Sequence, residues 1–139
     1  MTISVRILPE LSLVYIRYSG LALVAEGADA FAAYLRHPDF RPGQRQLVDL
    51  SAVTEVERDF PRLFRLQAEK AAAFMGHEHP VMLVYLAPNE ISLGMARLIE
   101  RSWEGLDGVL VRVASTLQEV NEILGLRADV LEESLARGV

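Results

Sequence analysis

The first twenty residues carry two short runs in which apolar and polar side chains alternate. Ile3, Val5 and Ile7 alternate with polar residues, and residues 11–18 are again rich in β-branched and aromatic side chains. A period of two predicts half-buried strands. Because only a short break at Pro9 separates the runs, they are expected to form an antiparallel hairpin.

Further along the chain, helical and strand-like patterns alternate. From about Ala22 the apolar residues follow one helix face, namely Val24, Ala28, Phe31, Ala32 and Leu35. Buried strands are predicted for residues 46–52, 81–87 and 109–113, where the apolar runs are short and continuous. The last two strands are each followed by a helical pattern.

The helix between the first two buried strands is expected to begin at Asp59, which can act as N-cap, and to end at Gly76. Its inner face is predicted to hold Leu63, Phe64, Ala68, Ala71, Ala72 and Met75. The next helix begins after Asn89, its expected N-cap. Its predicted inner face holds Ile91, Met95, Leu98, Ile99 and Trp103.

The order β-β-α-β-α-β-α-β-α predicts one α/β domain with helices packed on a mixed, mainly parallel sheet. We expect this domain to span residues 1–126. Residues 127–139 are predicted to form a C-terminal helical extension.

Composition and charge narrow the classes of protein to consider. With 51% hydrophobic and 24% charged residues the chain is globular, and its apolar runs are shorter than a membrane span. A net charge of −5 without a basic stripe argues against nucleic-acid binding. No cysteine and no signal-peptide pattern occur, so a cytoplasmic location is expected. Lys70 is the only lysine among fourteen basic residues.

Short motifs at matching spacing carry a family resemblance. These are His37-Pro38, Pro42-Gly43, Leu47-Val-Asp-Leu-Ser-Ala-Val-Thr54 and Gly94-Met-Ala-Arg97. Together they resemble the STAS domain of anti-sigma-factor antagonists, specifically a SpoIIAA-like group that is also compared with CRAL-TRIO lipid-binding domains. The resemblance covers roughly Ile3 to Leu126. It implies an α/β fold and a non-enzymatic regulatory role through protein contact.

One departure from that family concerns its phosphorylated serine. The family's Asp-Ser-Ser would fall near Glu57-Arg58-Asp59, where this chain has no hydroxyl group. The usual phosphoserine switch is therefore not expected at this loop. Acidic residues here could imitate the phosphorylated state, but acids at the start of a helix are ordinary helix chemistry.

The candidate chemistry is sparse. His77 and His79 supply two metal donors where zinc needs three or four, so a solvated loop is the preferred interpretation. Asp49 and Ser51 lie at the expected end of a central strand, without a histidine base or a nucleophile-elbow motif. Asp49 is expected to bond loop amides or an arginine such as Arg97, in a structural role. We therefore expect no catalytic residue, metal or cofactor.

The apolar residues of the two central helices exceed one inward stripe. Phe60, Phe64, Leu66 and Phe74 lie on the first helix, and Met95 and Trp103 on the second. An ordinary core, a homodimer interface and the wall of a lipid-sized pocket remain open as explanations.

The leading hypothesis is a dimeric, non-enzymatic STAS-type interaction module that contacts a protein partner through the loop and helix after Asp49. The alternative is a binding protein or sensor for a small apolar or lipid-like ligand held between the helices 60–75 and 91–103. An enzyme using Asp49 and Arg97 ranks lowest. The candidate interaction or ligand surface comprises Asp49, Ser51, Thr54, Glu57, Arg58, Asp59, Phe60, Phe64, Met95, Arg97 and Trp103.

Overall fold

A computed structural model describes residues 3–74, 80–127 and 129–137. In this part of the chain, five strands form one sheet in the order β1-β2-β3-β4-β5. The strands are β1 (Ile3–Leu8), β2 (Leu13–Ala22), β3 (Arg45–Val56), β4 (Val81–Leu86) and β5 (Val109–Ala114). β1 and β2 form the predicted antiparallel hairpin, and all other neighbours are parallel. The predicted α/β class and mixed sheet are confirmed.

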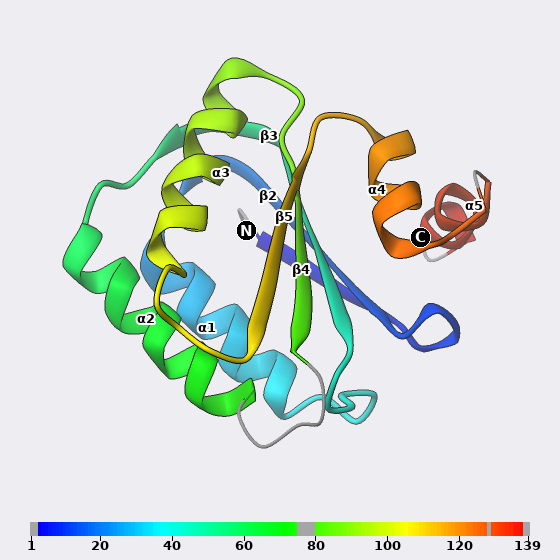
Figure 1. The fold of residues 1–139 in the computed structure, drawn as a ribbon, viewed down its shortest axis with the longest axis horizontal. Helices are drawn as coiled ribbons and strands as arrows, with labels where there is room; N and C mark the ends of the chain where they lie inside the picture. Colours follow the sequence, from blue (N-terminus) through cyan, green and yellow to red (C-terminus); the bar gives the residue numbers. More distant parts are fainter. Residues whose placement is uncertain (1–2, 75–79, 128, 138–139) are drawn as a thin grey trace.

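Helices cover both faces of the sheet (Figure 1). On one face lie α1 (Val24–Leu35), α2 (Phe60–Phe74) and α3 (Glu90–Ser102). On the other lie α4 (Leu117–Leu124) and α5 (Val130–Arg137). Because neighbouring strand residues point to opposite faces, β2, β3, β4 and β5 each contribute side chains to two separate cores. On β3, for example, Leu47 belongs to the core under α4 and α5, and Val48 to the core under α1–α3.

The predicted helix starts have the expected caps. The Asp59 Oδ1 atom accepts a hydrogen bond from the Arg62 backbone N–H at 3.2 Å. Asn89 and Ser92 bond each other's backbone N–H groups in a reciprocal capping box. Both caps satisfy amide groups that the first helical turn leaves without a partner.

Arginine side chains from two strands hold the C-terminal ends of α4 and α5. The Arg45 guanidinium donates to the Leu124 carbonyl at 2.6 Å, and Arg6 donates to the carbonyls of Ser134 and Leu135. The last carbonyls of a helix lack intrahelical partners and carry partial negative charge, so a cation stabilises them. In the segment predicted as a C-terminal extension, Leu131 is fully buried in the core under α4 and α5.

β3 is longer than predicted, and this moves Asp49 away from the strand end. The strand was expected to stop near residue 52, but it continues to Val56 because β2 stays paired with it as far as Ala22. Pairing with β4 ends earlier, at Asp49 opposite Leu86. Asp49 therefore lies where the pairing of β3 with β4 ends, but in the interior of β3 itself.

The prediction of the inner face of α2 is wrong, because the buried face is rotated by part of a turn from the predicted one. Leu66, Gln67, Ala71 and Phe74 are buried in α2, whereas Phe64 is 49% exposed. The true inner face includes polar residues, so a count of apolar positions selects a neighbouring face. On α3, Ile91 was expected inside and is 50% exposed. Met75 lies outside the described residues.

In the described part of the chain, no helix is both long and apolar enough to cross a membrane.

Replacing Gly94 with alanine is expected to stabilise the protein. Gly94 is exposed in the middle of α3, and an added Cβ would meet no atom within 4 Å. The free energy of unfolding should rise by about 0.5–1 kcal/mol, because glycine is a poor helix former. Thermal unfolding followed by circular dichroism measures this, and a lower melting temperature would contradict the open surroundings of Gly94.

Candidate functional site

A cavity of about 70 Å³ lies between the sheet and the helices α1, α2 and α3. Its wall is mainly apolar and includes Ile16, Val48, Leu66, Leu83, Met95, Ile99 and Trp103. A smaller cavity of about 30 Å³ shares Tyr18, Gln46 and Lys70 with it. A buried space of this size exceeds what one water molecule needs.

Two glutamines in the cavity wall have a buried polar atom without a hydrogen-bond partner in the described residues. Gln46 is 6% exposed and its Nε2 atom is unpartnered. Gln67 is 2% exposed and its Oε1 atom is unpartnered. An unsatisfied buried polar group costs about 1–3 kcal/mol, so native proteins rarely keep one without a reason.

The orientation of the Gln67 amide follows from its neighbours. Ser102 donates its hydroxyl proton to the Ile99 carbonyl, so toward Gln67 it can only accept. Gln67 Nε2 donates to Ser102 Oγ at 3.0 Å, which leaves Oε1 as the unpartnered atom.

Gln44 shows how the same side chain is satisfied elsewhere in the structure. Gln44 is as buried as Gln46, but its Oε1 accepts from the Tyr34 hydroxyl and its Nε2 donates to the Asp39 carbonyl. The fold can therefore satisfy a buried glutamine with its own groups. At the cavity it does not.

Lys70 brings a positive charge to the same cavity. Its side chain is half-buried, and the ammonium nitrogen lies 5.6 Å from the centre of the Phe31 ring. In the described residues, this ammonium group makes no ion pair and no hydrogen bond. Burial lowers the pKa of Lys70 from 10.5 to about 8, because burial removes part of the hydration of the charged amine.

Two tyrosines add hydroxyl groups to the wall. Trp103 Nε1 donates to the Tyr85 hydroxyl at 3.1 Å. In the described residues, the Tyr85 hydroxyl donates no hydrogen bond of its own. The Tyr18 hydroxyl is likewise without a bonded partner there. Burial raises the pKa of Tyr18 to about 12 and raises that of Tyr85 as well, so both stay protonated at neutral pH.

A surface groove of about 670 Å³ adjoins the cavity on the side of α2 and α3. Val56, Met95 and Leu98 line both the groove and the cavity. Phe60 and Ile91 are exposed apolar residues in its wall. The groove and the cavity therefore share part of their wall.

Asp49 is a structural residue on the opposite face of the sheet. One carboxylate oxygen accepts from the Tyr15 hydroxyl at 2.6 Å. The other accepts from the backbone N–H and the hydroxyl of Ser51. Tyr15 packs against the core under α4 and α5, so the sheet separates Asp49 from the cavity.

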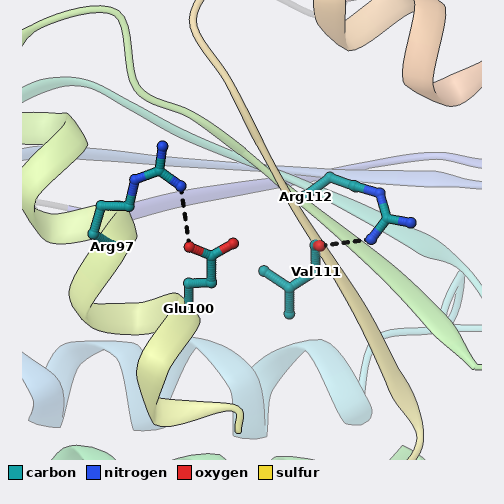
Figure 2. A network of polar contacts seen from close by, with 4 residues as sticks. All are labelled: Arg97, Glu100, Val111 and Arg112. Carbon is teal, nitrogen blue, oxygen red and sulfur yellow. Dashed lines mark hydrogen bonds and ion pairs between the residues drawn. The ribbon is translucent and has the colours of Figure 1, made fainter.

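Arg97 does not pair with Asp49 as one prediction suggested. Its guanidinium lies on the exposed side of α3 and bonds the Glu100 carboxylate at 3.1 Å (Figure 2). Arg112, drawn in the same view, bonds the backbone carbonyl of Val111 on β5. Asp49 and Arg97 are therefore not paired as the enzyme hypothesis requires.

The structure divides the remaining predicted site residues between the two hollows. Thr54, Arg58, Phe60 and Met95 line the groove. Glu57, Met95 and Trp103 line the cavity. Asp59 caps α2, and Phe64 lines neither of these two hollows. His77 and His79 lie outside the described residues, within which no three acidic or histidine side chains cluster as a metal site would require.

Sequence reasoning missed the polar residues of the cavity wall, namely Tyr18, Gln46, Gln67, Lys70 and Tyr85. A signal for two of them was present. Gln67 and Lys70 fall at helical spacing between the buried Leu66 and Phe74, so two polar residues share the inner face of α2.

Comparisons with known proteins supply no relative from which a function could be transferred. A scan against protein-family models and a search of curated proteins found no match for this chain.

Replacing Lys70 with methionine is expected to stabilise the empty protein. Because the pKa of Lys70 is lower in the folded protein than in the unfolded chain, its charge destabilises the fold at pH 7. That penalty is relieved as the pH rises from about 8 to 10.5. The melting temperature of the variant should exceed that of the wild type at pH 7, by about 3 °C per kcal/mol gained.

Differential scanning calorimetry at pH 7 and at pH 10.5 measures this difference. Arg65→Met is the matched control, since Arg65 is an exposed cation on the same helix. Equal melting temperatures of Lys70→Met and the wild type at pH 7 would show that the ammonium is fully solvated.

Proposed function

We propose that this protein binds a small amphipathic ligand in the cavity between the sheet and α1–α3, as a carrier or a sensor. The observation that supports this most is the pair of buried, unpartnered amide atoms on Gln46 and Gln67 in one cavity wall. A mainly apolar pocket with a few convergent polar groups is the usual form of a small-molecule site.

An ordinary protein core explains these features less well. At core positions that face a cavity, apolar side chains favour folding most, because a buried polar group without a partner destabilises the fold. Here two amides and one ammonium group line the same space. A ligand that bonds them would recover the lost hydrogen bonds when it binds.

The ligand hypothesis predicts a bound molecule or a bound probe. Native mass spectrometry of the freshly purified protein should show an adduct that a denatured, extracted sample lacks. In parallel, benzoate, benzamide, benzyl alcohol and hexanoate at millimolar concentration serve as probes in a thermal-shift assay. At least one should raise the melting temperature, since a ligand stabilises the state that binds it. No adduct and no shift would contradict the proposal and leave water as the occupant.

A matched pair of glycine variants locates the binding. A Cβ added at Gly27 would lie 3.1 Å from the Tyr18 hydroxyl oxygen and 3.8 Å from Leu66, both in the cavity wall. Gly27→Ala should weaken probe binding at least about tenfold, because one methyl group in a pocket matters that much. Gly94→Ala adds the same methyl group to a helix, in the wall of the groove and not of the cavity, and should leave the affinity at equilibrium unchanged. Equal affinities would place the probe elsewhere.

A second candidate function is the non-enzymatic interaction module of STAS type, acting as a homodimer. It is favoured by exposed apolar side chains in the N-terminal halves of α2 and α3, namely Phe60, Phe64, Ile91 and Leu93. Large apolar residues gathered at the surface are typical of a protein interface. The family resemblance of the sequence supports the same candidate.

The interaction candidate predicts self-association through Phe64. Phe64→Glu should shift a dimer toward monomer in sedimentation velocity, because an interface does not tolerate a buried charge without a partner. Arg65→Glu, at the exposed neighbouring position, is the control. A wild-type monomer at all concentrations, or an unchanged dimer in a folded Phe64→Glu variant, would contradict this candidate.

A further inference from the structure

Lys70 provides a charge in the cavity for which the described residues offer no counter-ion. The ammonium group makes no ion pair there, and its neighbour is the face of the Phe31 ring at 5.6 Å. A cation–π contact replaces only part of the hydration that a buried ammonium loses. Among the described residues, the positive charge of Lys70 therefore has no counter-ion.

The acid in the cavity wall does not provide that balance. Glu57 accepts a hydrogen bond from the Val24 backbone N–H at 3.3 Å, at the start of α1. Lys70 lies beside Phe31, seven residues further along the same helix. In the described residues, no ion pair joins Glu57 and Lys70.

The cavity wall that holds Lys70 also offers three groups that can donate hydrogen bonds. Gln46 Nε2 is unpartnered, and in the described residues the Tyr18 and Tyr85 hydroxyl protons have no acceptor. Gln67 Oε1 is a fully buried acceptor in the wall that has no partner among the described residues. Such a set is suited to a ligand whose polar end accepts several hydrogen bonds and carries negative charge.

The apolar surroundings of the cavity indicate which anion fits. A carboxylate carries one charge, which one lysine can neutralise. A phosphate carries nearly two charges and three strong acceptor oxygens, and it would leave part of its charge unpaired in an apolar wall. Leu83, Ile99 and Trp103 would contact the rest of the molecule.

We propose that Lys70 is the anion-binding group of this cavity and that the ligand is a small organic carboxylate with an apolar body. This inference rests on the ligand-binding function proposed above. Gln46 and the tyrosine hydroxyls share the carboxylate oxygens with the ammonium group. Gln67 Oε1 accepts from a hydroxyl or amino group of the ligand, or from a water molecule that accompanies it.

The decisive experiment compares isosteric neutral and anionic probes. Isothermal titration calorimetry is carried out with benzoate, benzamide, benzyl alcohol and inorganic phosphate on wild-type protein, Lys70→Met and Lys70→Arg. Benzoate should bind the wild type at least about tenfold more tightly than benzamide, since a hydrogen bond to a charged group is stronger than a neutral one. That preference should vanish in Lys70→Met and partly return in Lys70→Arg.

Nuclear magnetic resonance of the single lysine gives an independent readout. The ammonium signal of Lys70 can be followed without assignment, because the chain holds no other lysine. Benzoate should raise the pKa of Lys70 above its value of about 8 in the empty protein, and benzamide should not. An unchanged pKa in saturating benzoate would show that the carboxylate does not meet this group.

Affinity for benzoate should also fall at alkaline pH. One unit above its pKa of about 8, one-tenth of the Lys70 side chains remain charged, so binding should weaken about tenfold between pH 7 and pH 9. In the part of the chain that the structure describes, the other titratable groups that face this region are Tyr18, Tyr34, Tyr85, Glu26 and Glu57. The tyrosines stay protonated over this range, because burial raises their pKa values.

The possible results distinguish a failure of the carboxylate site from a failure of the proposed ligand-binding function. Binding of benzamide as tight as that of benzoate, or a benzoate preference that survives in Lys70→Met, overturns the carboxylate site and leaves the ligand-binding function standing. Binding of phosphate in preference to benzoate overturns the carboxylate assignment. Binding of no probe overturns both.

Discussion

The central sheet is apolar on both faces, and this constraint shapes the rest of the molecule. Leu47 and Val48 are neighbours on β3, yet they belong to separate cores on opposite sides. Each face must be covered, because exposed apolar surface of that extent would destabilise a monomer. α1, α2 and α3 cover one side, and α4 and α5 cover the other, where Arg6 and Arg45 hold their C-terminal carbonyls.

The two helical layers that cover the sheet differ in whether the polar side chains beneath them have hydrogen-bond partners in the described residues. On the side of α4 and α5, the Asp49 carboxylate is satisfied by Tyr15 and Ser51. On the side of α1–α3, Gln46 and Gln67 keep unpartnered atoms next to a cavity. Unmet hydrogen bonds are tolerated in native folds mainly where function requires them. The physical contrast between the two sides supports a functional role for the second.

The element order could be predicted from the sequence because it depends on local patterns. Alternation at Ile3, Val5 and Ile7 and the caps at Asp59 and Asn89 need no knowledge of distant residues. The site could not be predicted in the same way. Apolar counting selected Phe64 for the inner face of α2, since the true face carries Gln67 and Lys70. Gln46, Tyr18 and Tyr85 come from different strands and become neighbours only through sheet pairing, which no local pattern encodes.

The contact between Arg6 and α5 has a consequence for the order of folding in the cell. The two groups are 129 residues apart in the chain, so a ribosome working at the usual rate makes α5 about 6 to 26 s after β1. During that time β1 and β2 can form their hairpin, but Leu8 and Leu13 lack the cover that Leu131 later completes. The nascent sheet thus exposes an apolar face for seconds, which is the interval in which chaperones, rather than native contacts, would protect it.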